Sequence, residues 1–312
     1  MRGQKFRMKI KMLLIMATTI ATLSPLHAFK LTDTKIYDYA KPMEFAESID
    51  STEANMSIFR NLEVIETLTK KRALSKTKTQ AIEIDRMLAS KYSNVGFAFF
   101  LLGQQKVSHF FYEKAHLLDP NDLGRIFDYA HGLINTGYYN DGLTLMSELI
   151  KKQPENEMIW VGIADAYFKA GQLPEAITRC DEAIKKFPKT ESANYAFIQK
   201  IMQKTHLQKG FITPKFDELE SLNLIIWPGQ FIGLISGKIS EETFIEILKS
   251  EDEATQRKRL CEVMYYLGEL NLGVGNTETA KQYFKKTIEF KVDGFEETYS
   301  AKKRLKEIDE KR

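Results

Sequence analysis

The feature that most constrains the fold of this chain is a pattern that recurs every 34 residues between residues 89 and 190. Each block of the pattern carries a glycine near its middle and a proline near its end. These residues are Gly103, Gly137 and Gly171, and Pro120, Pro154 and Pro188. A period of this length is typical of helix pairs that cannot bury their apolar faces alone and therefore stack on their neighbours. The pattern predicts an all-α solenoid.

Small residues recur at two further positions in each block. They are Gly96, Ala130 and Ala164 in the first predicted helix, and Ser108, Gly142 and Ala176 in the second. Small side chains let two helix axes approach closely, and a larger one would overpack the crossing at a cost of about 1–3 kcal/mol. We expect the repeated glycines to end the first helices in a left-handed conformation, and the prolines to stop the second helices after residues 119, 153 and 187.

The third block carries the pattern most completely, because its aromatic, small and turn residues all fall in register. They are Trp160, Ile163, Ala164, Tyr167, Gly171, Ala176, Cys180, Ala183 and Pro188. The three blocks resemble the tetratricopeptide repeat (TPR) family. The resemblance implies a right-handed TPR helical solenoid whose role is to bind other proteins.

The rest of the chain divides around these three units at 89–190. Residues 29–53 show little periodicity and predict a flexible leader, whereas 54–88 show helical spacing and predict N-terminal helices that form a cap or a dimerisation pair. A capping helix and an irregular, apolar helical insert are expected over 191–260. Residues 261–312 are predicted to form a fourth TPR-like unit and a terminal helix that caps the array.

The N-terminus has the composition of a secretory signal over residues 1–28. Its basic residues, Arg2, Lys5, Arg7, Lys9 and Lys11, precede an apolar run over 12–23 and a cleavage motif over 26–28. The apolar run is shorter than the roughly 20 residues that span a bilayer, so no transmembrane segment is expected after signal cleavage. We predict an exported, periplasmic protein, with secretion as the alternative. Because no cysteine follows the apolar run, bacterial lipidation is not expected.

The charge of the chain argues against nucleic-acid binding. The whole sequence has a formal net charge of +3, but residues 1–28 hold five basic and no acidic residues, so the remainder carries −2. No basic stripe with interleaved aromatic residues is evident there. We therefore expect protein partners and no nucleic acid.

No pattern of a catalytic, cofactor or metal site is present in the sequence. The five histidines have no metal-ligand spacing, and residues 233–239 depart from a phosphate-binding loop in both glycine spacing and final residue. Cys180 and Cys261 fall in units that are not neighbours, which favours two separate buried thiols over a disulfide. The sequence predicts a protein that is not an enzyme and needs no cofactor.

The C-terminal half suggests a narrower resemblance. The segments 227–250, 257–290 and 294–308 are similar to the corresponding part of NlpI-type bacterial envelope TPR proteins, although this chain lacks their lipidated cysteine. That resemblance implies a homodimeric scaffold or adaptor in the cell envelope, which recruits a protease or peptidoglycan hydrolases.

In the TPR family the first helices of the units line a groove. The register places eight candidate partner-binding residues there: Phe97, Phe100, Phe127, His131, Ile134, Val161, Asp165 and Phe168. None is the Lys, Asn or Arg with which some TPR domains grip a terminal carboxylate, so the sequence favours an apolar helix or peptide as the ligand. Tyr265 and Glu269 are expected to continue this surface in the fourth unit. Two alternatives are that the chain's own insert, 219–235, or a second protomer fills the groove.

The leading hypothesis is therefore a non-enzymatic scaffold for protein–protein interactions. A secreted interaction factor that acts outside the cell is one alternative. An enzyme that uses the insert over 206–239 is another, with His206, Trp227 and Lys238 as the residues to test.

Overall fold

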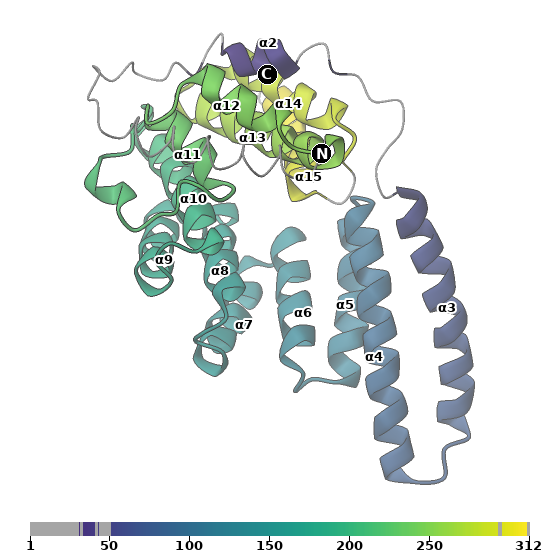
Figure 1. The fold of residues 1–312 in the computed structure, drawn as a ribbon. Coiled ribbons are helices and arrows are strands. Elements are labelled where there is room, and N and C mark those ends of the chain that lie inside the picture. The colour runs from purple at the N-terminus through teal and green to yellow at the C-terminus, as the bar shows by residue number, and fades with distance from the viewer. Residues whose placement is uncertain (1–30, 32–33, 41–42, 44–50, 293–294, 311–312) are drawn as a thin grey trace, which may run out of the picture.

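The computed structural model describes residues 31, 34–40, 43, 51–292 and 295–310, and its elements in this part of the chain are helical (Figure 1). The prediction of an all-α fold is confirmed. The predicted signal over 1–28 lies outside the described residues. Within the described part, no helix combines the length and the apolar character needed to cross a bilayer.

Three helix pairs form the predicted units and stand side by side in Figure 1. They are α4 (Lys78–Leu101) with α5 (Gln105–Leu118), α6 (Leu123–Asn135) with α7 (Tyr139–Lys152), and α8 (Glu157–Lys169) with α9 (Leu173–Lys186). Each first helix is followed by its repeated glycine with φ between 72° and 94°, as predicted. Each second helix ends just before its proline.

The small residues of the pattern lie where helices touch. A Cβ atom added to Gly96 would fall 2.7 Å from the ring of Tyr112, and one added to Gly142 would fall 2.6 Å from the side chain of Ile134. Ala164 is fully buried. A larger side chain at these positions would force the helices apart, which is the physical reason for the repeat.

The N-terminal helices differ from the prediction. Helix α3 (Ser51–Ala73) packs along α4, and α4 is one continuous helix of 24 residues. The last of the helices predicted over 54–88 and the first helix of the first unit are therefore a single element, with no break at residue 89. The turn between α3 and α4 is held by a salt bridge between Arg72 Nε and Asp85 Oδ1 at 2.7 Å.

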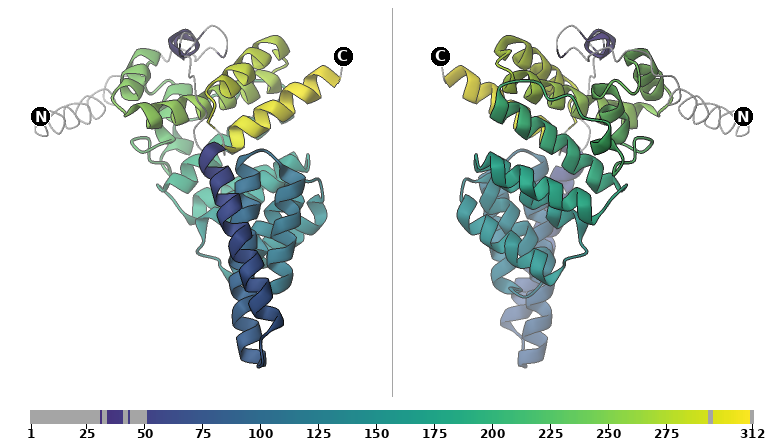
Figure 2. Two further views of the ribbon diagram at one scale, coloured as in Figure 1. Left: turned by 90° about the vertical axis from the view of Figure 1, so that its right-hand side faces the viewer. Right: turned by 90° about the vertical axis from the view of Figure 1, so that its left-hand side faces the viewer.

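The C-terminal half lies across one end of the repeat helices (Figures 1 and 2). It consists of α10 (Glu191–Gln208), the short 3-10 helix η1 (Asp217–Leu219), α11 (Gly229–Ile235), α12 (Glu241–Lys249), α13 (Glu253–Gly273), α14 (Thr277–Glu289) and α15 (Glu296–Glu310). Helices α13 and α14 pair like the earlier units: Gly268 faces Phe284, and Gly275 takes a φ of 88°. The first helix of this unit begins at Glu253 rather than at the predicted residue 261.

The insert between α10 and α12 is packed and is not a linker. Phe231, Ile232 and Ile235 of α11 are buried in the largest hydrophobic cluster, together with Phe244 of α12 and Tyr266 of α13. This cluster joins the insert to the fourth unit. Both cysteines are also buried in it, and both are free thiols.

Part of the predicted flexible leader is ordered, which corrects the prediction for residues 29–53. Helix α2 (Lys35–Ala40) packs on α12 and buries Ile36. The hydroxyl groups of Thr34 and Tyr283 are 3.0 Å apart, and Asn271 Nδ2 donates to the carbonyl of Leu31 at 3.0 Å. These contacts were not foreseeable from the local sequence, since each joins residues more than 200 positions apart.

Candidate partner-binding groove

The structure brings most of the predicted groove residues together. A groove of about 790 Å³ lies between the first helices of the repeat units and the C-terminal helices α10, α13 and α15. Six of the eight predicted residues line it: Phe100 from α4, Phe127 and His131 from α6, and Val161, Asp165 and Phe168 from α8. Three successive units therefore contribute to one surface.

Aromatic contacts order this repeat wall. The ring of His131 is 5.3 Å from that of Phe100 in an edge-on arrangement and 6.4 Å from that of Phe127 in a stacked one. Burial lowers the pKa of His131 to about 4, with the nearby Lys169 adding to the effect against the opposing influence of Glu296. At neutral pH the imidazole is therefore uncharged and acts as one more aromatic surface.

Two of the predicted residues lie elsewhere. Ile134 is 2% exposed and packs into the core of the second unit, because its side chain fills the space that Gly142 leaves open. Phe97 is 54% exposed and stacks on Phe100 at 6.3 Å, but it does not line the groove. The repeat register therefore identified the helix faces that meet at the groove. It did not identify which residues at the margins of those faces, such as Ile134 and Phe97, line the groove.

The opposite wall comes from the C-terminal half. Its residues are Tyr195, Ile198, Gln199 and Met202 from α10, Tyr265 and Tyr266 from α13, and Glu296, Glu297 and Ser300 from α15. Of these, the sequence pattern suggested only Tyr265, as a continuation of the groove. The others could not be found from the repeat register, because they follow no 34-residue spacing. The adjacent acidic pair Glu296 and Glu297 at the start of α15 was the visible signal in the sequence.

Carboxylates dominate the charge of the groove. Among the residues that line it in the described chain, Glu157, Asp165, Glu191, Glu296 and Glu297 are acidic and none is lysine or arginine. The prediction of an apolar groove is therefore incomplete. The groove combines aromatic rings with negative charge.

One buried cation lies next to the groove and is fully engaged. Lys169 Nζ is 2.8 Å from Asp165 Oδ2, donates to Asn135 Oδ1 at 3.1 Å and forms a salt bridge with Glu296. Burial alone would lower the pKa of Lys169, but the two carboxylates outweigh burial and raise it. Burial likewise opposes ionisation of Glu296, but Lys169 holds the pKa of that carboxyl at about 2. This contact fixes the start of α15 to the third unit.

Behind the groove, Glu262 of α13 is a second unusual carboxyl. It is 7% exposed, and its Oε2 accepts hydrogen bonds from Trp227 Nε1 at 2.8 Å, from the Tyr195 hydroxyl at 3.3 Å and from the Tyr266 hydroxyl at 3.4 Å. Burial raises its pKa to about 7, although these hydrogen bonds act in the opposite direction. It links the insert to two tyrosines of the groove.

The insert does not occupy the groove. No residue of 219–235 lines it, which contradicts the alternative that this segment fills it. The start of α15 lines the groove instead, through Glu296, Glu297 and Ser300. In Figure 2 this helix lies at one end of the repeat helices. Glu269, expected on the groove surface, is instead fully buried, where it binds Arg304 Nε at 2.6 Å and His206 Nε2 at 2.9 Å.

The residues of the enzyme hypothesis are each engaged in separate structural contacts. His206 binds Glu269, Trp227 donates to Glu262, and the ammonium of Lys238 lies 3.6 Å from the ring centroid of Phe216. Among the residues that the structure describes, no group of His, Cys, Asp and Glu is placed to hold a metal ion.

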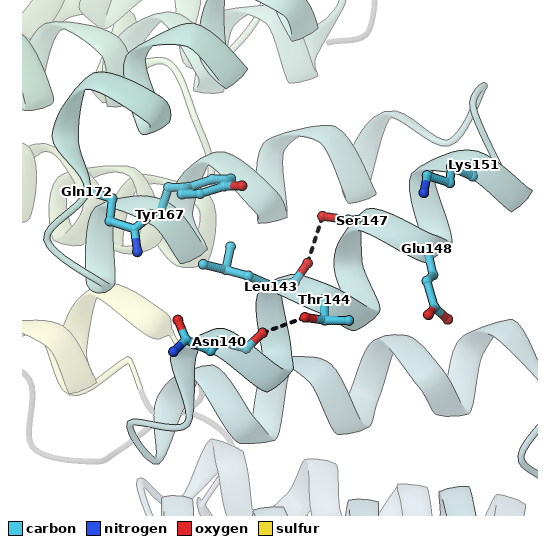
Figure 3. A pocket seen from close by; sticks show the side chains of 8 residues that line it. All are labelled: Asn140, Leu143, Thr144, Ser147, Glu148, Lys151, Tyr167 and Gln172. Atoms are coloured by element: carbon cyan, nitrogen blue, oxygen red, sulfur yellow. Dashed lines mark hydrogen bonds between the residues drawn. The ribbon is translucent and has the colours of Figure 1, made fainter.

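A second hollow, of about 460 Å³, lies over α7 (Figure 3). Its serine and threonine hydroxyl groups bond within their own helix: Thr144 donates to the carbonyl of Asn140 and Ser147 to that of Leu143, both at 2.8 Å. Among the described residues that line it, the charged ones are Glu148 and Lys151, at the right of the view. The groove is the stronger candidate because several helices converge on it.

Comparison with known proteins supports the repeat assignment locally. No curated protein shows a significant sequence match. Among solved structures, a thermophilic TPR protein of Thermus thermophilus is 14% identical with a TM-score of 0.41, over 70% of this chain and 98% of its own. A tetratricopeptide repeat protein of Parabacteroides merdae is 14% identical with a TM-score of 0.40, over 81% of this chain and 99% of its own. Scores of this size carry no conclusion about function. The tetratricopeptide repeat family model matches residues 133–201, so this chain contains a TPR segment that runs from the end of α6 through α7, α8 and α9 into α10.

Proposed function

We propose that the protein is a non-catalytic scaffold that binds other proteins through the groove. One observation carries the proposal: six side chains from three successive helix pairs converge on a groove of about 790 Å³. A TPR segment is typical of interaction surfaces, and an aromatic groove of this kind accepts a helix or an extended peptide. Such a scaffold acts by holding two partners close together, which raises their effective concentration without chemistry.

The cell envelope is the proposed location, and a protease or a peptidoglycan hydrolase is the proposed class of recruited enzyme. The basic and apolar residues over 1–28 and the resemblance of 227–308 to NlpI-type proteins support this part. Fractionation of cells separates the periplasm from the medium. Recovery of the protein mainly from the medium would favour an extracellular role instead.

The test of the scaffold is cross-linking in cell envelopes, followed by identification of the captured proteins. Each captured protein is then purified and its binding is measured against wild type and the double variant Phe127→Glu with Phe168→Glu. We expect the double variant to lose binding, because two charges are placed in the aromatic wall.

The matched control is Phe59→Glu with Phe110→Glu, since these side chains are 72% and 49% exposed and lie outside the groove. Melting curves establish that both double variants are folded. If the groove variant is unfolded, Phe100→Ala with Phe127→Ala replaces it. Envelope partners that bind a folded groove variant as tightly as wild type would overturn the proposal.

A further inference from the structure

We propose that the groove selects a basic segment of its partner, in which lysine or arginine side chains alternate with apolar ones. This inference rests on the proposed scaffold function and adds the chemistry of the ligand. Three features of the groove support it: its acidic residues, its aromatic rings and a hydrogen-bond acceptor that has no donor.

The groove has more acidic than basic residues. Lys169 neutralises part of this negative charge through its salt bridges with Asp165 and Glu296. Glu157, Glu191 and Glu297 also line the groove, and none of the three forms a salt bridge with another residue that the structure describes. Burial and the neighbouring carboxylates of Glu262 and Glu296 raise the pKa of Glu297 well above its usual range, so this carboxyl holds its proton in the free groove. A cation beside it would favour the ionised form, and the resulting carboxylate would pair with that cation.

Aromatic rings line much of the groove. Phe100, Phe127, Phe168, Tyr195, Tyr265 and Tyr266 all line the groove beside the carboxylates. A ring face attracts a lysine or arginine side chain, and the attraction grows where water is excluded. The same protein already uses this contact at the edge of the groove, where the guanidinium of Arg304 lies 5.6 Å from the ring centroid of Phe168.

The groove also contains a hydrogen-bond acceptor that has no donor. Gln199 lines the groove, and its Oε1 atom is buried with no hydrogen-bond partner in the described part of the chain. A buried acceptor that lacks a partner costs free energy, so a ligand that supplies N–H groups gains by meeting it. Ammonium and guanidinium groups donate hydrogen bonds and accept none.

Apolar residues lie among these polar groups and explain why a peptide fits better than a small cation. Val161, Ile198 and Met202 line the same groove, so apolar side chains of the ligand have partners between the charged ones. An alternating sequence satisfies both kinds of contact.

The test measures binding of short fluorescent peptides to the full chain by anisotropy. One peptide alternates Lys and Arg with Leu and Phe, a second replaces every basic residue with Ser, and a third replaces it with Glu. We expect the basic peptide to bind about tenfold or more tightly than the Ser peptide and to weaken as salt is added. Glu191→Gln with Glu297→Gln should weaken binding of the basic peptide by about tenfold, since it removes two acidic groups that can pair with a bound cation while keeping their size.

The control variant is Glu148→Gln with Glu175→Gln, which changes the net charge equally at positions outside the groove. Its affinity should match wild type. Equal binding of the three peptides, no binding of the basic peptide, or equal affinity for the two double variants would overturn the inference. Envelope partners that still depend on Phe127 and Phe168 would show, in that case, that the scaffold function stands without this selectivity.

Discussion

The two halves of the molecule differ in how far along the chain their contacts reach. In the repeat half, α4 to α9, each helix packs mainly on its neighbours in the chain, and small residues such as Gly96 and Gly142 set the distance between helices. In the C-terminal half, α10 to α15, buried polar and charged groups also join elements that are distant in sequence. His206 Nε2, for example, lies 2.9 Å from Glu269 Oε2, which is 63 positions along the chain.

This difference shows how the groove acquires two kinds of chemistry. A repeating pattern can place similar apolar side chains on successive helices, as at Phe127 and Phe168. It does not by itself place an acidic cluster opposite them. The C-terminal half supplies that cluster through Glu296 and Glu297, which reach the repeat half through the salt bridge between Glu296 and Lys169.

The most sensitive point of the comparison is the buried ion cluster of the C-terminal half. Arg304→Met would leave Glu269, which is 0% exposed, with His206 as its remaining partner. Removing one member of a buried ion pair costs about 3–5 kcal/mol, and we expect about 3 kcal/mol because Arg304 is partly exposed. Denaturant unfolding measures it. Lys302→Met, at an exposed site of the same helix, should change the free energy of unfolding little.

In the repeat half, the site most sensitive to substitution is a helix crossing. Ala164 is fully buried on α8, and Ala164→Leu would overpack the crossing at a cost of about 1–3 kcal/mol. Lys185→Ala removes an exposed charge from α9 and should cost less than about 0.5 kcal/mol. Equal melting temperatures for the two variants would show that the repeat register is wrong.

The sequence predicted the repeat half well because the spacing of its small and turn residues determines where the helices end and how they pack. Gly103, Gly137 and Gly171 each end a helix with positive φ, and these positions were assigned from the 34-residue period alone. The six predicted residues that line the groove follow from the same period. Ile134 was misplaced because the period identifies a helix face but does not indicate which residue at its margin enters the core.

The C-terminal half was predicted as helical but not in its contacts. The position of α2 is held by contacts of Thr34 and Leu31, whose partners Tyr283 and Asn271 lie in the C-terminal part of the chain. The acidic side of the groove, formed by Glu296 and Glu297, depends on how the start of α15 contacts α8. Both are tertiary contacts without a local signature, so no pattern of spacing could reveal them.

A third prediction concerns the pH dependence that Glu262 gives to the C-terminal half. Burial raises the pKa of Glu262 to about 7 from an ordinary value of 4.5. The folded protein therefore holds this proton at pH values where the unfolded chain has lost it. The stabilisation from Glu262 is complete below about pH 4.5 and is lost as the pH rises through about 7.

Glu262→Gln mimics the protonated carboxyl and removes this dependence. Between about pH 5 and about pH 8, the free energy of unfolding of wild type should fall relative to that of the variant by on the order of 1–2 kcal/mol. Unfolding curves collected across this range measure the difference. A constant difference between the two proteins would mean that Glu262 keeps an ordinary pKa.

The smallest effect compares how the two halves end their helices. Gly171 has a φ of 76°, and a Cβ atom there would meet nothing within 4 Å, so Gly171→Ala tests backbone strain alone and should cost about 1 kcal/mol. The C-terminal half ends α10 with Lys209 at a φ of 55°. Lys209→Gly removes the same strain but frees the unfolded chain, so we expect a net gain in stability of about 0.5 kcal/mol.

Thermal unfolding of the two single variants should therefore shift in opposite directions. Opposite shifts would mean that the turns after α8 and α10 share the left-handed conformation, and that glycine takes it without the strain that lysine carries. If Lys209→Gly instead destabilises the protein, the lysine side chain must contribute more through its contacts than the backbone loses. The end of α10 would then be held by tertiary packing, as the rest of the C-terminal half is.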